Sequence, residues 1–165
     1  MRSTSAKIVL LAHAVAQVRA WRAAGETVVF ANGVFDLVHV GHVRYLSGAR
    51  VQGSRLVVGI NSDRSAAELK GPGRPVLGER ERALLIAALR VVDRVVIFDE
   101  RSADAILEAL APDVHAQGTD YRPATAPERA TMSGLGGRTV VAGDPESHAS
   151  RELYERVRAR QADRE

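Results

Sequence analysis

Two hydrophobic periods alternate along this chain. Short runs rich in β-branched residues predict buried strands, whereas apolar residues three or four positions apart predict helices that bury one face. The expected strands are residues 27–30, 55–60, 94–98, 113–116 and 139–141. The expected helices are residues 42–51, a short segment after residue 63, and residues 79–91, 103–110 and roughly 150–160. Strands and helices that alternate in this order are typical of a parallel sheet.

A further helix is expected before the first strand. Its apolar positions lie close to one helical stripe: Ile8, Leu11, Val15, Val18 and Trp21. Gly25 ends this helix, because glycine tolerates the backbone conformation that follows a last helical turn. We therefore expect residues 1–25 to form an N-terminal helix packed on residues 26–165, and the chain to be a single domain overall.

The predicted fold is a single doubly wound, Rossmann-like α/β domain, with a parallel sheet and helices on both faces. In such sheets, ligands bind beyond the carboxyl ends of the strands. Polar segments fall at three such ends, at residues 39–42, 61–63 and 117–120. Their side chains are therefore expected to converge on one crevice.

The composition limits the setting in which the domain works. The 165-residue chain has no cysteine, which excludes disulfides and zinc-thiolate sites and is typical of a reducing cytoplasm. The apolar stretch 8–18 is interrupted by His13 and Gln17 and is too short to span a bilayer. We expect a cytoplasmic protein that does not enter the membrane.

The charge of the chain could suggest a nucleic-acid partner. The net charge is +3 and the pI is about 9.8, but the arginines are interleaved with glutamates and aspartates. Few aromatic side chains are available to stack on bases, since aromatic residues make up 4% of the chain. The pattern favours a solvated surface that attracts small phosphorylated molecules over a surface that binds nucleic acid.

The most informative motif is His39-Val40-Gly41-His42, which follows the first expected strand and a turn-like stretch at 31–36. Two imidazoles three positions apart at the start of a helix share one face, and the intervening glycine leaves the backbone open to a phosphate. The motif therefore predicts a place for a triphosphate. Zinc is disfavoured, because the chain has no cysteine and no HExxH motif or third nearby ligand.

The other histidines have structural interpretations. His13 is expected on the outer side of its helix, and His115 falls within a strand pattern. We expect His115 to be packed or hydrogen-bonded rather than catalytic.

Two segments rich in glycine and proline are predicted to be loops, at residues 71–75 and 121–127. Lys70 and Arg74 lie on or beside the first of them. A loop with two cations next to a phosphate site can close over the ligand, so we expect a lid at residues 70–75.

Taken together, segments 32–42, 58–63, 69–76 and 118–121 resemble the HxGH nucleotidyltransferases of the cytidylyltransferase-like superfamily. Within that superfamily the chain is most similar to the adenylyltransferases that make ADP-heptose from heptose 1-phosphate. The resemblance covers residues 27–157. It implies a nucleotidyltransferase domain that joins ATP to a sugar 1-phosphate and releases pyrophosphate. It further implies Mg²⁺ bound with ATP, no metal-binding residue, small-molecule partners only, and a homodimer.

The resemblance also implies a role for each site residue. Three residues match catalytic positions: His39, His42 and Lys70. Eleven match nucleotide-binding positions: Asn32, Gly33, Phe35, Gly41, Arg74, Arg82, Gln117, Gly118, Asp120, Ser150 and Arg151. Three match acceptor-binding positions: Asp36, Asn61 and Asp63.

The chain departs from the family pattern in two places. Gln117 stands where relatives usually have a lysine, and Thr119 replaces a glycine. The segment Ala149-Ser150-Arg151 replaces a cap richer in hydroxyls at the start of the last helix. The first change weakens phosphate binding or moves that duty elsewhere, and the second leaves one hydroxyl and adds an arginine.

Two other functions stay open at this stage. One is a cytidylyltransferase that acts on glycerol 3-phosphate or a similar small phosphate. The other is a nucleotide-binding module without turnover, which the two departures favour. Retention of both histidines, Lys70 and Arg74 favours an enzyme.

Overall fold

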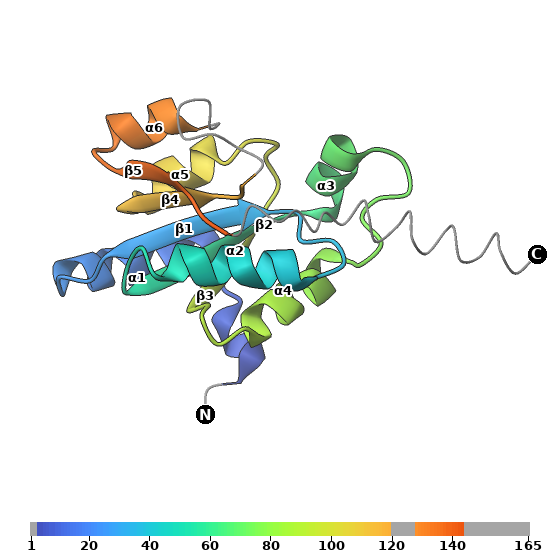
Figure 1. The fold of residues 1–165 in the computed structure, drawn as a ribbon, viewed down its shortest axis with the longest axis horizontal. Helices are drawn as coiled ribbons and strands as arrows, with labels where there is room; N and C mark the ends of the chain where they lie inside the picture. The colour runs from blue at the N-terminus through green and yellow to red at the C-terminus, as the bar shows by residue number, and fades with distance from the viewer. Residues whose placement is uncertain (1–2, 120–127, 144–165) are drawn as a thin grey trace, which may run out of the picture.

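The structure, a computed structural model, describes residues 3–119 and 128–143 (Figure 1). Within these residues, parallel strands form one sheet in the order β3-β2-β1-β4-β5. The strands are β1 (Val28–Gly33), β2 (Arg55–Asn61), β3 (Arg94–Phe98), β4 (Val114–Gln117) and β5 (Arg138–Val141). The parallel α/β sheet expected from the sequence is confirmed.

Helices cover both faces of this sheet. One buried cluster joins β1 and β2 to α2 (Val40–Arg50) and α4 (Glu79–Ala88). The second cluster, on the opposite face, involves the helices α1 (Leu11–Ala23), α5 (Asp104–Leu110) and α6 (Arg129–Gly134). The residues of β1 alternate between the two clusters, as the alternation of side chains along a strand requires. The sheet is therefore buried on both sides, which explains why its strands are almost continuously apolar.

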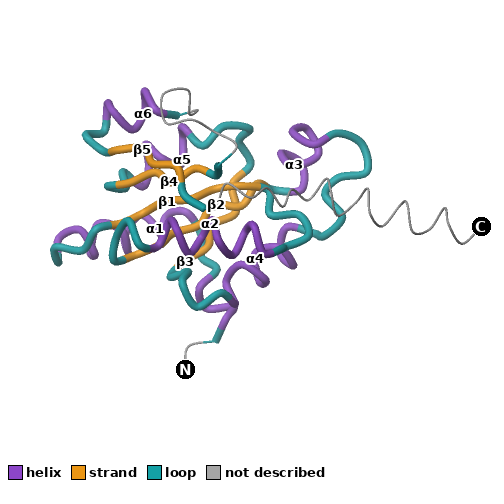
Figure 2. The backbone as a smooth tube through the Cα atoms, viewed as in Figure 1, coloured by secondary structure: helices purple, strands orange, loops and turns teal. Residues whose placement is uncertain are grey.

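The segments of interest gather at the carboxyl edge of the sheet. Figure 2 shows long loops at this edge, next to the short helix α3 (Asp63–Lys70) that follows β2 directly. Strand β1 has β2 on one side and β4 on the other, so the chain winds in opposite directions from β1. The gap between β1 and β4 is therefore the topological switch point, where ligands of such sheets bind.

Several element boundaries differ from the expected ones. Strand β1 continues to Gly33, because Asn32 and Gly33 pair with Gly59 and Ile60 near the end of β2. Ile8 lies outside α1, since it forms a bridge with Val95 and the helix begins three residues later. Helix α4 ends at Ala88, and α2 begins at Val40.

Two short elements were not anticipated from the sequence: α6 and a single 3-10 turn at Thr4–Lys7. Met132 is the buried residue of α6, so its amphipathic signal is weak. His13 is exposed on α1, as expected. Among the described residues, no helix has the length and apolar character needed to cross a membrane. The expected last helix and the loop at 121–127 lie outside the described residues.

Candidate active site

The turn between β1 and α2 has an unusual backbone. Phe35 and Leu37 have φ angles of 52° and 53°, in the left-handed region that residues other than glycine rarely adopt. Phe35 is nevertheless buried, and its ring lies against Tyr45 and edge-on to His42 at a centroid distance of 5.2 Å. A side chain on Gly33 would begin 3.2 Å from the Phe35 ring, so the glycine makes room for this packing. The packed ring explains how the turn keeps its conformation.

The two histidines of the motif cap helix α2. The Gly41 N–H donates to His39 Nδ1 at 3.2 Å, and the His39 N–H donates to His42 Nδ1 at 3.4 Å. The two rings lie 3.9 Å apart between centroids. Because each Nδ1 accepts a hydrogen bond, a neutral ring has its proton on Nε2. The donor of a neutral ring in this pair is therefore its Nε2–H group.

His42 stays neutral at neutral pH. Burial, followed by the nearby charges of His39 and Lys70, lowers the pKa of His42 to about 4. Lys70 is the exposed last residue of α3, so its effect on His42 places its charge near the pair. The structure thus brings together the three residues that the sequence assigned to catalysis.

Asp36 holds the loop that follows α3. Its carboxylate accepts hydrogen bonds from the Val76 and Leu77 N–H groups, at 3.0 and 3.2 Å, and pairs with Arg74 at 3.4 Å. The side chain is 6% exposed. The second half of the loop is therefore tied to the β1–α2 turn. Residues 71–75 form a loop as expected, whereas closure of a lid stays a prediction.

Arg82 links three segments of the site. The fully buried guanidinium donates to the Val34 carbonyl at 2.6 Å, to the Leu77 carbonyl at 2.9 Å and to Asp63 Oδ1 at 2.8 Å. These partners belong to the β1–α2 turn, the loop and the start of α3. Contact of Arg82 with nucleotide stays a prediction, and the geometry gives this residue a supporting position beneath the site.

Asn61 is also engaged by the protein. It is 3% exposed, and its Nδ2 donates to Ser65 Oγ at 2.9 Å and to the Glu100 carbonyl at 3.3 Å. The Ser65 N–H donates to Ser62 Oγ, which caps α3. Asn61 therefore fixes the start of α3. The expected contacts of Asp36, Asn61 and Asp63 with an acceptor are not tested by this arrangement.

The end of β4 has a different character. Gln117, the residue that replaces the family's lysine, donates from Nε2 to Glu128 Oε2 at 2.9 Å. The Ala103 N–H donates to the other oxygen of Glu128 at 3.1 Å. Burial raises the pKa of Glu128, which stands at the start of α6 with a φ of 60°. Sequence reasoning missed Glu128, because nothing in its neighbourhood along the chain indicates that it faces Gln117.

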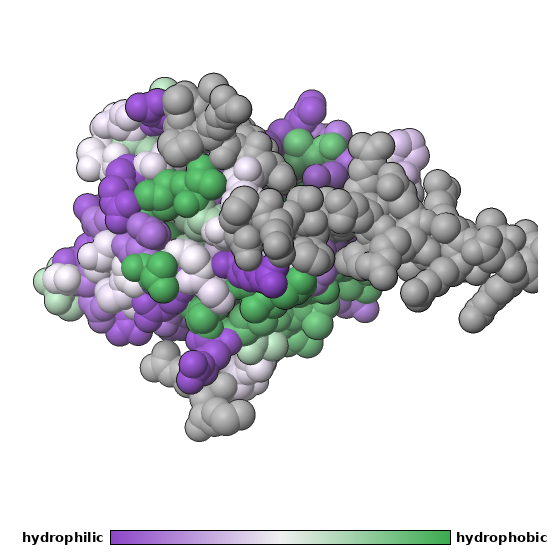
Figure 3. Space-filling model, in the orientation of Figure 1, coloured by the Kyte–Doolittle hydropathy of each residue, from purple (hydrophilic) through white to green (hydrophobic). Residues whose placement is uncertain are grey.

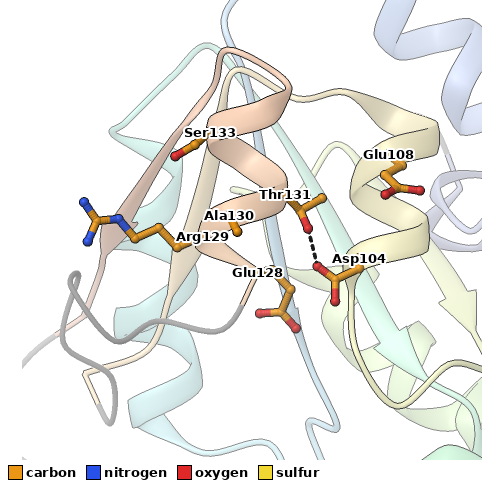
Figure 4. A pocket seen from close by; sticks show the side chains of 7 residues that line it. All are labelled: Asp104, Glu108, Glu128, Arg129, Ala130, Thr131 and Ser133. Carbon is orange, nitrogen blue, oxygen red and sulfur yellow. Dashed lines mark hydrogen bonds between the residues drawn. The ribbon is translucent and has the colours of Figure 1, made fainter.

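Residues of α5 and α6, with Glu128, line a pocket of about 730 Å³ that is open to solvent (Figure 4). Its lining includes Asp104, Glu108 and Glu128, while the Arg129 side chain points away from the group (Figure 4). Asp104 accepts a hydrogen bond from Thr131 across the pocket. None of the predicted site residues lines this pocket, and Gln117 connects it to the end of β4 through Glu128.

Two further predicted positions lie at the switch point. Asn32 is half-buried at the end of β1, and Gly118 follows β4. The remaining predicted residues lie outside the described residues: Asp120, Ser150 and Arg151. Tyr45, which the sequence analysis did not select, donates its hydroxyl to the Ala116 carbonyl at 2.7 Å. Its position three residues after His42, on the same helical face, was the available signal.

Apolar side chains gather on the surface over α2 and α4 (Figure 3). The exposed members on these helices are Val40, Val43, Leu84 and Leu85. The expected homodimer stays a prediction.

Comparisons with known proteins show the family of this chain. The family model for cytidylyltransferase-like proteins matches residues 30–158. The bifunctional protein HldE of Methylobacillus flagellatus is 45% identical over 151 residues, which are 89% of this chain and 31% of HldE. HldE of Magnetococcus marinus is 43% identical, over 94% of this chain and 32% of that protein. The chain thus spans about a third of the length of these curated relatives.

A solved structure is also similar. It is the lipopolysaccharide core biosynthesis protein from Thermoplasma volcanium, with a TM-score of 0.62 and 29% sequence identity. The match covers 73% of this chain and 98% of that protein. The likeness therefore extends over nearly the whole of the other molecule and over most of the elements described above.

Proposed function

Because this chain belongs to the cytidylyltransferase-like family and is a nucleotidyltransferase, we propose that it joins ATP to D-glycero-D-manno-heptose 1-phosphate. The products are ADP-heptose and pyrophosphate. The observation that best supports the choice of a sugar phosphate is the similarity to HldE proteins across most of the chain, together with a solved relative named for lipopolysaccharide core biosynthesis. The motif resemblance beyond His39-Val40-Gly41-His42 points the same way.

The reaction needs one bond to form and one to break. An oxygen of the sugar phosphate attacks the α-phosphorus of ATP, and the bond from that phosphorus to the bridging oxygen of the β-phosphate breaks. Pyrophosphate leaves with the bonding electrons. The attacking phosphate is already an anion at neutral pH, so catalysis depends on positioning and on stabilising the negative charge that builds at the α-phosphate.

The histidine pair is suited to that charge. Both rings are fixed by hydrogen bonds at Nδ1, so their Nε2–H donors are set before the substrate arrives. A neutral imidazole can still donate a hydrogen bond to the triphosphate. The low pKa of His42 keeps its ring neutral. In this proposal His39 and His42 donate to the triphosphate and to the oxygens of the reacting phosphorus.

The cations of the loop supply the remaining charge. Lys70 is exposed beside His42, and Arg74 is held near the β1–α2 turn by Asp36. We assign Lys70 to the phosphates of the nucleotide, where its flexible side chain reaches the site as the loop closes. Asp36 then contributes by holding the loop, in addition to any contact with the sugar.

Magnesium is expected to enter with ATP. Among the residues that the structure describes, no group of three histidine, aspartate or glutamate side chains is arranged to hold a metal ion. The donors at the site, imidazole N–H groups and cations, suit an anion instead. We assign the ion to phosphate oxygens and water, where it balances the charge of the triphosphate.

A pyrophosphate-release assay tests the proposal. ATP, CTP, GTP and UTP are each supplied with Mg²⁺, alone or with heptose 1-phosphate or glycerol 3-phosphate. We expect release to be fastest from ATP with heptose 1-phosphate and to require the acceptor. A matched pair of variants, His42→Ala and His13→Ala, shows whether the release comes from this site or from a contaminating enzyme. His13 is an exposed histidine on α1, so its replacement is the control.

Other outcomes would assign a different function. Faster release from CTP with glycerol 3-phosphate than from ATP with heptose 1-phosphate would favour a cytidylyltransferase, which the description of the family keeps as the runner-up. Binding of a nucleotide without release of pyrophosphate from any pair would point to a nucleotide-binding module.

A further inference from the structure

His115 is buried at the switch point without a role in the chemistry described so far. It lies in β4 directly opposite Phe30 of β1, and its ring packs against the Phe30 ring at a centroid distance of 5.9 Å. Asn32 follows Phe30 by two residues, so its side chain lies on the same face of the sheet. His115 and Asn32 thus span the gap between β1 and β4.

One hydrogen bond joins them. His115 Nε2 lies 2.8 Å from Asn32 Oδ1. An amide oxygen only accepts, so His115 must donate, and the neutral ring has its proton on Nε2. Burial lowers the pKa of His115 to about 4, against the opposing effect of Asp104, so this neutral form is present at neutral pH.

The other ring nitrogen indicates why a histidine stands here. His115 Nδ1 is buried and, among the described residues, has no hydrogen-bond partner. A buried acceptor without a partner destabilises the fold, and a hydrocarbon side chain of similar size would fill the space without that cost. Packing alone therefore does not explain the imidazole, whereas the bond to Asn32 does.

We propose that His115 is a positioning residue that fixes the amide of Asn32, so that Asn32 Nδ2 donates to the phosphates of the nucleotide at the switch point. The amide is planar, with Nδ2 on the opposite side from Oδ1. A bond from His115 to Oδ1 therefore turns Nδ2 away from β4, toward the carboxyl edge where the β1–α2 turn begins. The inference rests on nucleotide binding by this site, and it holds for either candidate triphosphate.

Substitutions at position 115 separate the donor from the ring. In His115→Gln, the side-chain amide nitrogen is as many bonds from Cα as Nε2 of histidine is, so it restores the donor. His115→Asn is the matched control, because its amide reaches only the position of Nδ1. His115→Leu fills the space without any donor.

The expected result is a change in nucleotide affinity more than in turnover. The nucleotide is whichever of ATP, CTP, GTP and UTP the unsubstituted protein binds most tightly by calorimetry with Mg²⁺. His115→Leu and His115→Asn should raise its Kd and KM by about tenfold, the upper range for one hydrogen bond, with kcat nearly unchanged. His115→Gln should recover most of the affinity. Unfolding in urea checks that each variant is folded, so that the change in affinity is measured on folded protein.

Repeating the substitution in the Asn32→Ala variant makes the test specific to Asn32. In Asn32→Ala, the added substitution His115→Leu should change Kd very little, because the group that it positions is gone. An equal loss of affinity in both backgrounds, or no loss in either, overturns the proposal. If His115→Leu does not fold, the comparison of His115→Gln with His115→Asn decides the point. Failure of the proposed substrates appears separately, as pyrophosphate release with another pair, and leaves this cycle interpretable.

Discussion

The two sides of the switch point are built with different charge. On the side of β1 and β2, Arg82 and Arg74 pair with Asp63 and Asp36, and Lys70 adds a cation. On the side of β4, the polar centre is the half-buried carboxyl of Glu128, which accepts a hydrogen bond from Gln117. The named groups of the first side are three cations and two carboxylates, a balance that suits the proposed triphosphate. The second side has the uncharged amide of Gln117 and no cation at that position.

The largest expected effect concerns the support of the first side. Arg82→Met removes three hydrogen bonds and leaves Asp63 and two carbonyl groups without their partner. We expect the free energy of unfolding to fall by about 3 kcal/mol, because hydrogen bonds to a charged group contribute about 1.5–3 kcal/mol each and the Asp63 carboxylate, which is half exposed, regains water. Urea unfolding measures it. The control is Arg80→Met, an exposed arginine on the same helix, and equal stability of the two variants would show that the buried network does not hold the site.

Loss of either motif histidine should be nearly as large, in activity rather than stability. His39→Ala and His42→Ala each remove a fixed donor to the reacting phosphate, so we expect kcat to fall by about a hundredfold or more. Nucleotide affinity should fall less. Steady-state kinetics at saturating substrate and Mg²⁺ give both quantities, with His13→Ala as the control. Near-normal kcat in both variants would contradict the assignment of catalysis to the first side.

Acid should destabilise both sides through one histidine each. Burial is the main cause that lowers the pKa of His42 and of His115 to about 4, whereas an unfolded chain titrates its histidines near 6.5. Between these values the unfolded state binds protons that the folded state does not. The free energy of unfolding should therefore fall as the pH drops from 6.5 toward 4.

Urea unfolding across this pH range tests the expectation. His115→Leu removes one of the two buried imidazoles, so its stability should depend less steeply on pH than that of the starting protein. If the free energy of unfolding falls equally steeply with pH in both proteins, the second side does not contribute to acid sensitivity.

The smallest expected effect comes from giving the second side a cation, as the first side has. Gln117→Lys places a cation beside Glu128. We expect the KM for the nucleotide to fall by about two- to fivefold at low ionic strength, and the gain to shrink in high salt. Gln117→Met is the control without charge. A KM that rises in Gln117→Lys would show that the second side does not approach the phosphates.

Sequence reasoning located the elements better than their ends. The parallel sheet followed from alternating periods, but β1 was expected to end at Phe30, because Asn32 and Gly33 look like turn residues. They are strand residues because β2 offers partners to them, and such pairing is not local. Helix α6 escaped detection for a related reason, since it buries only Met132 and packs in a place that the rest of the fold defines.

What the sequence determined by itself is the chemistry available at the site. The spacing in His39-Val40-Gly41-His42 puts two imidazoles on one helical face, and the loop at 71–75 follows from its glycines and prolines. These are local properties of the chain. The family resemblance added Lys70 as a third member of the group, and in the structure the charge of Lys70 acts on His42.

Only the tertiary structure decided which polar groups face one another. Arg82 and Asp36 resemble ligand-binding residues in the sequence, yet their side chains hold segments of the protein itself. His115 looks structural in the sequence and Glu128 was not selected from it, yet they contact Asn32 and Gln117 at the switch point. The physical reason is that a buried polar group must find a partner, and its partner is chosen by strand order and helix packing rather than by distance along the chain.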